Sequence, residues 1–193
     1  MCQDLWTDAS NWWVDGPVQI RPFQGGDVDQ VYAAVRESVA EVGRWLPDLA
    51  NPSRDDIASY IATRPAAWSN GTAYSFAIVD GQDGRFLGGT GLSSIHSTHR
   101  FANLFYWVRS RELRRGVATA AALLTARFGF DRLALNRVEI VVAVDNHASL
   151  RVAEKVGAVR EGVLRNRLML HGTIHDAVMF SLVPRDLATR AAA

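Results

Sequence analysis

The sequence has one cysteine, Cys2, among its 193 residues. One thiol cannot form an intramolecular disulfide, so the chain is not a disulfide-stapled secreted scaffold. It also lacks an apolar run long enough to span a bilayer, and it lacks the basic start and apolar core of a signal peptide. We therefore expect a cytoplasmic protein.

An excess of either charge is also missing, because 21 Lys and Arg residues accompany 20 Asp and Glu residues. A nearly neutral chain has no global field to recruit nucleic acid or an anionic membrane, so neither is expected as a partner. Any anion site must be local. The close histidine pairs, His96 with His99 and His171 with His175, have no recognisable third ligand, so we expect no metal.

The common nucleotide-binding motifs are missing as well. No glycine-rich loop ends in Gly-Lys-Ser or Gly-Lys-Thr, and the "GGTG" segment at residues 88–91 lacks the spacing of a dinucleotide-binding loop. Because this segment has strand character, its glycines indicate a bulge or a closely packed strand.

What is present is an alternation of helix and strand patterns. Asp27 and Gln30 form a capping-box pattern that predicts a helix ending near Leu46, and the helix after Ser53 is expected to stop before Pro65. The other predicted elements are strands at 18–23, 73–80, 85–95, 102–108 and 137–144, helices at 116–133 and 148–156, and two strands around a turn at 171–172. This order favours an α/β fold with a mixed sheet. We expect an N-terminal extension at residues 1–17, one domain at 18–187 and a C-terminal tail at 188–193.

The segment 113–121, "LRRGVATAA", gathers positive charge and bare backbone where a helix begins. The first amide hydrogens of a helix are unpaired, and the helix dipole makes this end positive. Gly116 lets an anion approach these amides, and Arg114 and Arg115 can add charge-assisted bonds, so the segment predicts a phosphate or pyrophosphate site. An exposed arginine loop before a helix that packs through small residues explains the same segment equally well.

Several segments in order carry a resemblance. They are Tyr106-Trp107-Val108, "RRGVATAA" at 114–121, "NRVEIVVAVDNHASLRVAEKVGAVREGVLR" at 136–165, and Asp176. Together they resemble the acetyl-CoA-dependent GNAT superfamily and, within it, the branch of ribosomal-protein N-terminal acetyltransferases of the RimJ/RimL type. The resemblance covers residues 18–183, and its specificity rests on the combination of motifs.

The resemblance implies a single GNAT-like domain whose mixed, mostly antiparallel sheet splays between two central parallel strands and is flanked by helices. The pantetheine of acetyl-CoA would enter the splay, and its pyrophosphate would bind the loop that begins at Leu113. Leu113 and Arg114 depart from the usual residues of this loop, whereas Gly116 and Ala118 match. The implied cofactor-binding residues are Tyr106, Trp107, Val108, Arg114, Arg115, Gly116, Val117, Ala118, Thr119, Asn146 and Lys155.

Catalytic roles are implied for Asn146 and Ser149, beside the thioester, with Ser149 helping the thiolate to leave. Locally, the same two residues also fit an ordinary turn followed by a first helical turn. The tyrosine that many superfamily members use as general acid corresponds to Ala153, so that acid is absent. The candidate general bases are Glu112, Glu139, Asp145 and Glu161. A water-mediated route without a dedicated base is the alternative.

The expected reaction moves an acetyl group from acetyl-CoA directly to a primary amine, and the favoured acceptor is a protein or peptide N-terminal α-amine. A small amine, such as an antibiotic, a polyamine or an amino-acid derivative, is a second hypothesis. A non-catalytic acyl-CoA-binding regulatory module is a third. Trp45, Trp68 and Trp107 are candidates to line the acceptor cleft. The resemblance also implies a homodimer.

Overall fold

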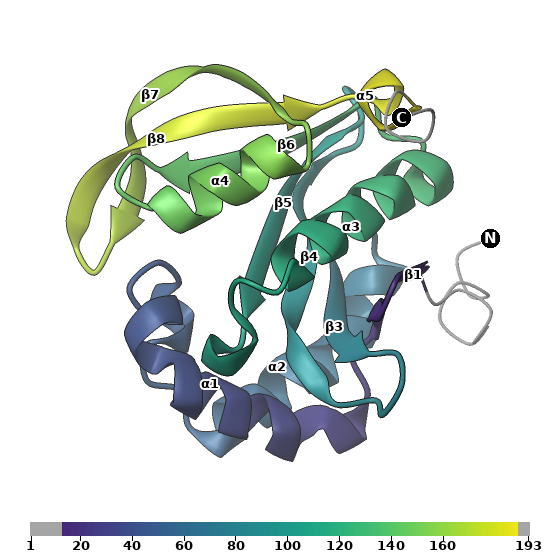
Figure 1. The fold of residues 1–193 in the computed structure, drawn as a ribbon, viewed down its shortest axis with the longest axis vertical. Helices are drawn as coiled ribbons and strands as arrows, with labels where there is room; N and C mark the ends of the chain where they lie inside the picture. Colours follow the sequence, from purple (N-terminus) through teal and green to yellow (C-terminus); the bar gives the residue numbers. More distant parts are fainter. Residues whose placement is uncertain (1–12, 189–193) are drawn as a thin grey trace.

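The sheet organises the molecule. The computed structural model describes residues 13–188, so Cys2 and most of the predicted extension and tail lie outside the described residues. Within residues 13–188, eight strands form one sheet in the order β1-β2-β3-β4-β5-β6-β8-β7. All neighbouring strands are antiparallel except β5 and β6, which are parallel. The predicted α/β fold with a mixed, mostly antiparallel sheet is confirmed (Figure 1).

The elements follow one another in nearly the predicted order. The first half of the chain contains β1 (Trp13–Asp15), β2 (Val18–Pro22), η2 (Gly25–Asp27), α1 (Val28–Val42), η3 (Pro47–Leu49), α2 (Arg54–Ser69), β3 (Tyr74–Asp80) and β4 (Phe86–His96). The second half contains β5 (Phe101–Val108), η4 (Ser110–Glu112), α3 (Val117–Leu133), β6 (Arg137–Ala143), α4 (His147–Lys155), β7 (Val159–Leu170), β8 (Thr173–Leu182) and α5 (Pro184–Ala188). No helix within residues 13–188 has both the length and the apolar character needed to cross a membrane.

Helices cover the two faces of the sheet unequally. The larger core lies between the sheet and helices α3 and α4, where Leu124, Phe128 and Ala153 are buried. A smaller core lies on the other face, where Val35 of α1 and Ile61 of α2 pack against the first strands. Helices α3 and α4 lie on the same side of the sheet in Figure 1, while α1 and α2 gather around its opposite end. This arrangement leaves the β7–β8 hairpin projecting from the sheet.

Helix α2 does not stop before Pro65, so that prediction is wrong. The helix continues for another turn to Ser69, with Pro65 inside it. A proline removes one amide donor from a helix. The buried ring of Trp68 offsets this loss, because it packs with ring centroids 5.1 Å from Phe76 and 5.5 Å from Phe128. Trp68 therefore belongs to the core and does not line an acceptor cleft.

The start of α1 also differs from the prediction. Asp27 makes no capping bond to the helix. Its carboxylate instead forms a buried, bidentate pair with Arg21, at 2.6 and 2.8 Å, and accepts the backbone N–H of Gln24. Gln30 accepts the amide of Phe86 from β4. A buried guanidinium needs a countercharge, and this requirement prevails over the local capping pattern.

Helix α1 ends at Val42, before the predicted Leu46. Residues 43–46 form a turn in which the amides of Trp45 and Leu46 both donate to the carbonyl oxygen of Val42. At Gly43 an added Cβ would lie 2.6 Å from the Val39 oxygen and 2.8 Å from the Cα of Ala50. The close approach of two backbone segments therefore requires a glycine here, and the turn directs the following residues away from the helix.

The glycines of "GGTG" lie inside β4, paired with both neighbouring strands. A Cβ at Gly88 would lie 2.2 Å from the carbonyl oxygen of Trp107, and a Cβ at Gly89 would lie 2.6 Å from the Trp107 ring. The predicted close packing is confirmed. It lets β5 cross β4 closely at the end of β5 that leads to the candidate site.

Candidate active site

The two parallel strands separate after a short stretch of pairing. Strand β5 pairs with β6 only from Phe101 to Asn103, opposite Arg137 to Glu139. Beyond this point β6 stays paired with β8 and β5 stays paired with β4. The edge of β5 from Leu104 to Val108 therefore has no partner from β6, and its backbone groups are available to a ligand. The splay implied by the resemblance is confirmed.

The loop before α3 has the geometry of an anion-binding helix start. Helix α3 begins at Val117, and Gly116 precedes it in the left-handed region with φ +81°. No heavy atom lies within 4 Å of where a Gly116 Cβ would be, so the space beside this backbone is open. The first intrahelical bond shown at this end runs from the amide of Ala120 to Gly116. The amides from Val117 to Thr119 therefore point out of the helix, toward this loop.

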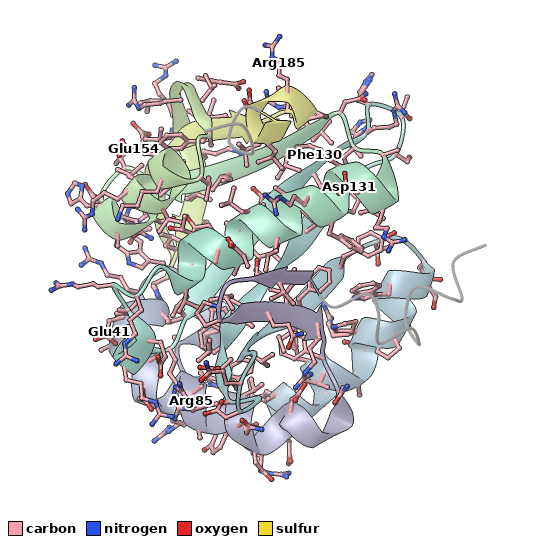
Figure 2. The ribbon with its side chains drawn as sticks, turned by 45° about the vertical axis from the view of Figure 1, so that its right-hand side comes forward. Glu41, Arg85, Phe130, Asp131, Glu154 and Arg185 are labelled. Carbon is pink, nitrogen blue, oxygen red and sulfur yellow. The ribbon has the colours of Figure 1, made fainter. Side chains whose placement is uncertain are left out.

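Glu112 anchors the same loop. Its carboxylate is buried and forms ion pairs with Arg85, with Arg115 at 3.2 Å and with Arg111 at 3.7 Å. Arg85, labelled in Figure 2, lies in the turn between β3 and β4 and donates a hydrogen bond to Glu112. Arg85 also pairs with Asp80 and Asp83, and Arg111 also pairs with Glu37, so Glu112 belongs to a network of ion pairs that fixes the loop. Glu112 is therefore a structural anchor, and the alternative of an exposed loop residue is wrong.

Asn146 and Ser149 form a helix cap. The side chain of Asn146 accepts the amide of Ser149 at 3.1 Å, at the N-terminus of α4. This bond fixes the position of the Ser149 hydroxyl relative to the end of β6. Asn146 and Ser149 therefore do form the turn and first helical turn that the sequence also allowed. The cap uses the amide of Ser149 and not its hydroxyl, so a catalytic role of the hydroxyl is compatible with it.

Tyr106 of β5 reaches across the splay to Ser149. Its hydroxyl lies 2.8 Å from Ser149 Oγ and 3.2 Å from the Ser149 carbonyl oxygen. Burial raises the pKa of Tyr106 to about 12, although the hydrogen bond to Ser149 opposes the rise. The phenol therefore stays protonated at neutral pH. Ala153, the position to which the resemblance assigns a general-acid tyrosine, is fully buried, and the tyrosine that contacts this helix comes from strand β5.

A solvent-open cavity lies at the other end of this arrangement. It has a volume of about 270 Å³. Three separate segments line it: the turn after α1, the junction of β6 and α4, and the tip of the β7–β8 hairpin. The lining residues are Arg44, Trp45, Asp145, Leu170, His171, Thr173 and His175. Asp145 directly precedes the cap residue Asn146, so the cavity lining and the cap of α4 are neighbours in the chain.

A long-range hydrogen bond closes one side of the cavity. His171 Nε2 donates to the carbonyl oxygen of Gly43 at 2.8 Å and so joins the hairpin tip to the turn after α1. His171 and Gly172 both have positive φ, at 49° and 77°, as the predicted tight turn requires. In Figure 1 the hairpin curves toward the end of α1. The turn geometry therefore directs His171 to its partner.

The other candidate bases are held by arginine. Arg137 lies 2.8 Å from Glu139 and forms a bidentate pair with Glu161 at 2.6 Å. Hydrogen bonds from Arg137 and Ser181 lower the pKa of Glu161 to about 2. A carboxylate that holds its charge so firmly is a poor proton acceptor at neutral pH. Asp145 has no ion pair within residues 13–188, so it is the best-placed candidate.

The remaining predicted residues are spread around the site. Trp107 packs on Phe86, with ring centroids 5.7 Å apart, and does not line the cavity; of the three tryptophans named, Trp45 does. Arg114 is exposed, and its φ of 63° is left-handed. Lys155 is exposed in the last turn of α4, near Glu154 in Figure 2, and its contact with phosphate stays a prediction. The described chain contains no group of three or more residues able to hold a metal.

Sequence reasoning missed Arg44 and the partnerships of His171 and Tyr106. Arg44 lies over the Trp45 ring, 4.6 Å from its centroid. No local pattern marks these contacts, since His171 and Gly43 are 128 positions apart. The only available signal was the pair of adjacent bulky residues at the end of the first helix.

Comparisons with known proteins agree with this geometry. A family model described as an acetyltransferase (GNAT) domain matches residues 18–159. YdaF of Bacillus subtilis (strain 168), provisionally named a ribosomal N-acetyltransferase, is 31% identical over 175 residues, covering 90% of this chain and 94% of that protein. A spermidine N(1)-acetyltransferase of Escherichia coli (strain K12) is 28% identical over 96 residues, covering 50% of this chain and 52% of its own length.

A solved structure supports the same conclusion. It comes from Vibrio cholerae and is provisionally described as a ribosomal-protein-serine acetyltransferase. Its TM-score is 0.76 at 26% identity, and the match covers 90% of this chain and 97% of the other. With the matching family model and the relatives, this shows that the chain belongs to the GNAT acetyltransferase family and is an acetyl-CoA-dependent N-acetyltransferase.

Proposed function

We propose that the protein acetylates the N-terminal α-amine of a protein or peptide. The observation that carries this proposal is the open cavity, in which Arg44, Asp145, His171 and Thr173 are exposed. Sites for free small molecules usually bury most of the ligand surface. An open cavity of about 270 Å³ instead suits an acceptor whose first residues enter while the rest of its chain remains outside. The names of the relatives from Bacillus subtilis and Vibrio cholerae support this choice.

The residues of the cofactor side fit acetyl-CoA, which supplies the activated acetyl thioester. The amides of Val117, Ala118 and Thr119 and the open backbone at Gly116 suit the pyrophosphate. Arg114 and Arg115 add positive charge there. The unpaired edge of β5 from Tyr106 to Val108 suits the amides of pantetheine, which form hydrogen bonds like those of a strand.

Asp145 faces the acceptor. An α-amine attacks a thioester only in its neutral form, so a proton must leave the ammonium group. Asp145 lines the cavity next to Asn146 and can receive the hydrogen bonds of that ammonium group. Water in the open cavity can then carry the proton away. This assignment selects Asp145 among the carboxylates predicted as bases.

Ser149 and Tyr106 serve the departing thiolate. When the phenol of Tyr106 donates to Ser149 Oγ, the serine hydrogen is free to point toward the sulfur. A phenol with a pKa of about 12 does not protonate a thiolate whose own pKa is about 8.5, so Tyr106 keeps its proton and orients Ser149. Ser149 is the catalytic residue, and Tyr106 is its positioning residue.

The test follows thiol release from acetyl-CoA by the purified protein. Separate reactions contain N-terminal peptides, small amines including spermidine, or no acceptor. Release that depends on peptides supports the proposal. Thiol release only with small amines would show that the acceptor is a small amine and not a peptide. No thiol release with either class, despite binding of acetyl-CoA, would indicate a binding module. The homodimer, the cytoplasmic location and the domain boundaries at 18 and 187 stay predictions.

A further inference from the structure

The cavity beside Asp145 carries both signs of charge. Asp145 contributes one carboxylate and Arg44 contributes one guanidinium, while His171 and His175 add imidazoles that carry either no charge or a positive one. The lining is therefore neutral or positive. A polyamine carries several ammonium groups, and each requires a countercharge when it leaves water. One carboxylate beside a guanidinium does not supply them.

Arg44 is oriented by an aromatic ring and not by an ion pair. Its guanidinium lies 4.6 Å from the centroid of the Trp45 ring, which orients it without neutralising it. Arg44 has no ion pair within residues 13–188. Arg44 directly follows Gly43, whose carbonyl oxygen accepts a hydrogen bond from His171. The guanidinium of Arg44 therefore lines the cavity from a turn that is hydrogen-bonded to the β7–β8 hairpin.

Two exposed arginines of β7 come shortly before Leu168, which pairs with His175 of the cavity lining. Arg165 and Arg167 are exposed in the irregular stretch between the pairs Leu164–Ala177 and Leu168–His175. The second of these pairs includes a residue of the cavity lining. The nearby acid, Asp176, accepts the backbone amide of Asn166 at 2.8 Å.

We infer that the cavity selects N-terminal peptides with an acidic side chain within their first residues. Asp145 receives the α-amine, and Arg44 binds the carboxylate of the acidic side chain. This inference rests on the proposed acetylation of an N-terminal α-amine and names the class of peptide. It assigns Arg44 as a specificity-determining residue.

The experiment compares four acceptors with the full-length protein and acetyl-CoA. Three peptides of equal length begin with serine and continue with two aspartates, two asparagines or two lysines, and the fourth acceptor is spermidine. We expect kcat/KM to fall from the acidic to the neutral to the basic peptide, by about fivefold at each step, as for partly exposed charge pairs. The variant Arg44→Glu is expected to reverse this order.

Arg64→Glu is the matched control. Arg64 is also stacked on an aromatic ring, 4.1 Å from the centroid of Tyr60, but it lies on α2 and does not line the cavity. It should keep the order found for the unaltered protein. Equal kcat/KM for the three peptides, or an order that survives Arg44→Glu, would overturn the selectivity while leaving peptide acetylation intact. Acetylation of spermidine alone would overturn the proposed function and this inference with it.

Discussion

The loop at Gly116 and the cavity at Asp145 are built in opposite ways. The loop is almost continuous in sequence, because Glu112, Gly116 and the first amides of α3 follow one another. The cavity is assembled from the turn after α1, the end of β6 and the hairpin tip, which only the fold brings together. A local site of the first kind can change little without losing its anion. A site made from distant segments can change its acceptor while the fold stays the same.

The largest expected effect concerns Ser149, which belongs to neither region. Ser149→Ala removes the hydroxyl that serves the thiolate but keeps the amide that Asn146 binds. We expect kcat to fall by about 10- to 100-fold, the loss of one hydrogen bond to a charged group, with at most a small drop in melting temperature because Tyr106 keeps its bond to the Ser149 carbonyl oxygen. Steady-state kinetics and a melting curve check this, and Ser149→Thr should restore part of the activity.

A double-mutant cycle tests whether Tyr106 acts through Ser149. In the Ser149→Ala background, Tyr106→Phe should cause no further loss of kcat, because the hydroxyl that it orients is gone. An independent loss of equal size in both backgrounds would contradict the positioning role.

The second effect should be confined to the cofactor side. Gly116→Val places a β-branched residue at φ +81° and a side chain in the space assigned to the pyrophosphate. We expect the KM for acetyl-CoA to rise about 20-fold, because valine avoids a left-handed conformation that costs about 1–2 kcal/mol, and the loop then turns its amides away from the pyrophosphate. Gly162→Val is the control, because Gly162 also has open space around it but no positive φ. An equal rise in the KM for acetyl-CoA in both variants would contradict the assignment of the Gly116 loop to the pyrophosphate.

The third effect should be confined to the acceptor side. Asp145→Asn keeps the size of the side chain and removes its charge. The kcat/KM for a peptide is expected to fall about tenfold, the cost of one charge-assisted hydrogen bond, while the KM for acetyl-CoA stays unchanged. Initial rates with each substrate varied in turn measure both constants. A matching rise in the KM for acetyl-CoA would remove the distinction between the two regions.

A smaller effect sharpens the account of the cavity wall. His171→Ala removes the bond to Gly43 that joins the hairpin to the turn after α1. One hydrogen bond of about 1 kcal/mol corresponds to a rise in the peptide KM of about threefold to fivefold. His175 lines the same cavity but does not make this bond, so His175→Ala is the control. An unchanged KM in the His171 variant would show that the bond does not shape the site.

The smallest effect concerns stability away from both regions. The folded-state pKa of Glu161, about 2, lies below its ordinary value of 4.5. Its pair with Arg137 therefore stabilises the fold above pH 4.5, and this contribution disappears as the pH falls toward 2. Because Glu161 is partly exposed, we expect less than about 1 kcal/mol. Urea unfolding at pH 7 and pH 3 should show less pH dependence in Glu161→Gln than in the parent, and an identical dependence would contradict the pairing.

The same contrast explains what the sequence could predict. The start of α3, the tight turn at His171 and Gly172 and the order of the main elements along the chain depend on local chemistry or on motif order, and they agree with the structure. The wrong predictions concern residues whose conformation depends on a tertiary contact. Asp27 pairs with Arg21 instead of capping α1, and α2 continues beyond Pro65 because Trp68 is buried in the core. Tyr106 beside Ser149 and Arg44 in the cavity were missed for the same reason.

The central claim is that the acceptor is an N-terminal α-amine. The most direct measurement uses one peptide with a free α-amine and a single lysine, incubated with the protein and acetyl-CoA and sequenced by tandem mass spectrometry. The account predicts one acetyl group, on the α-amine. An acetyl group on the lysine ε-amine alone, or none while spermidine is acetylated, would contradict it.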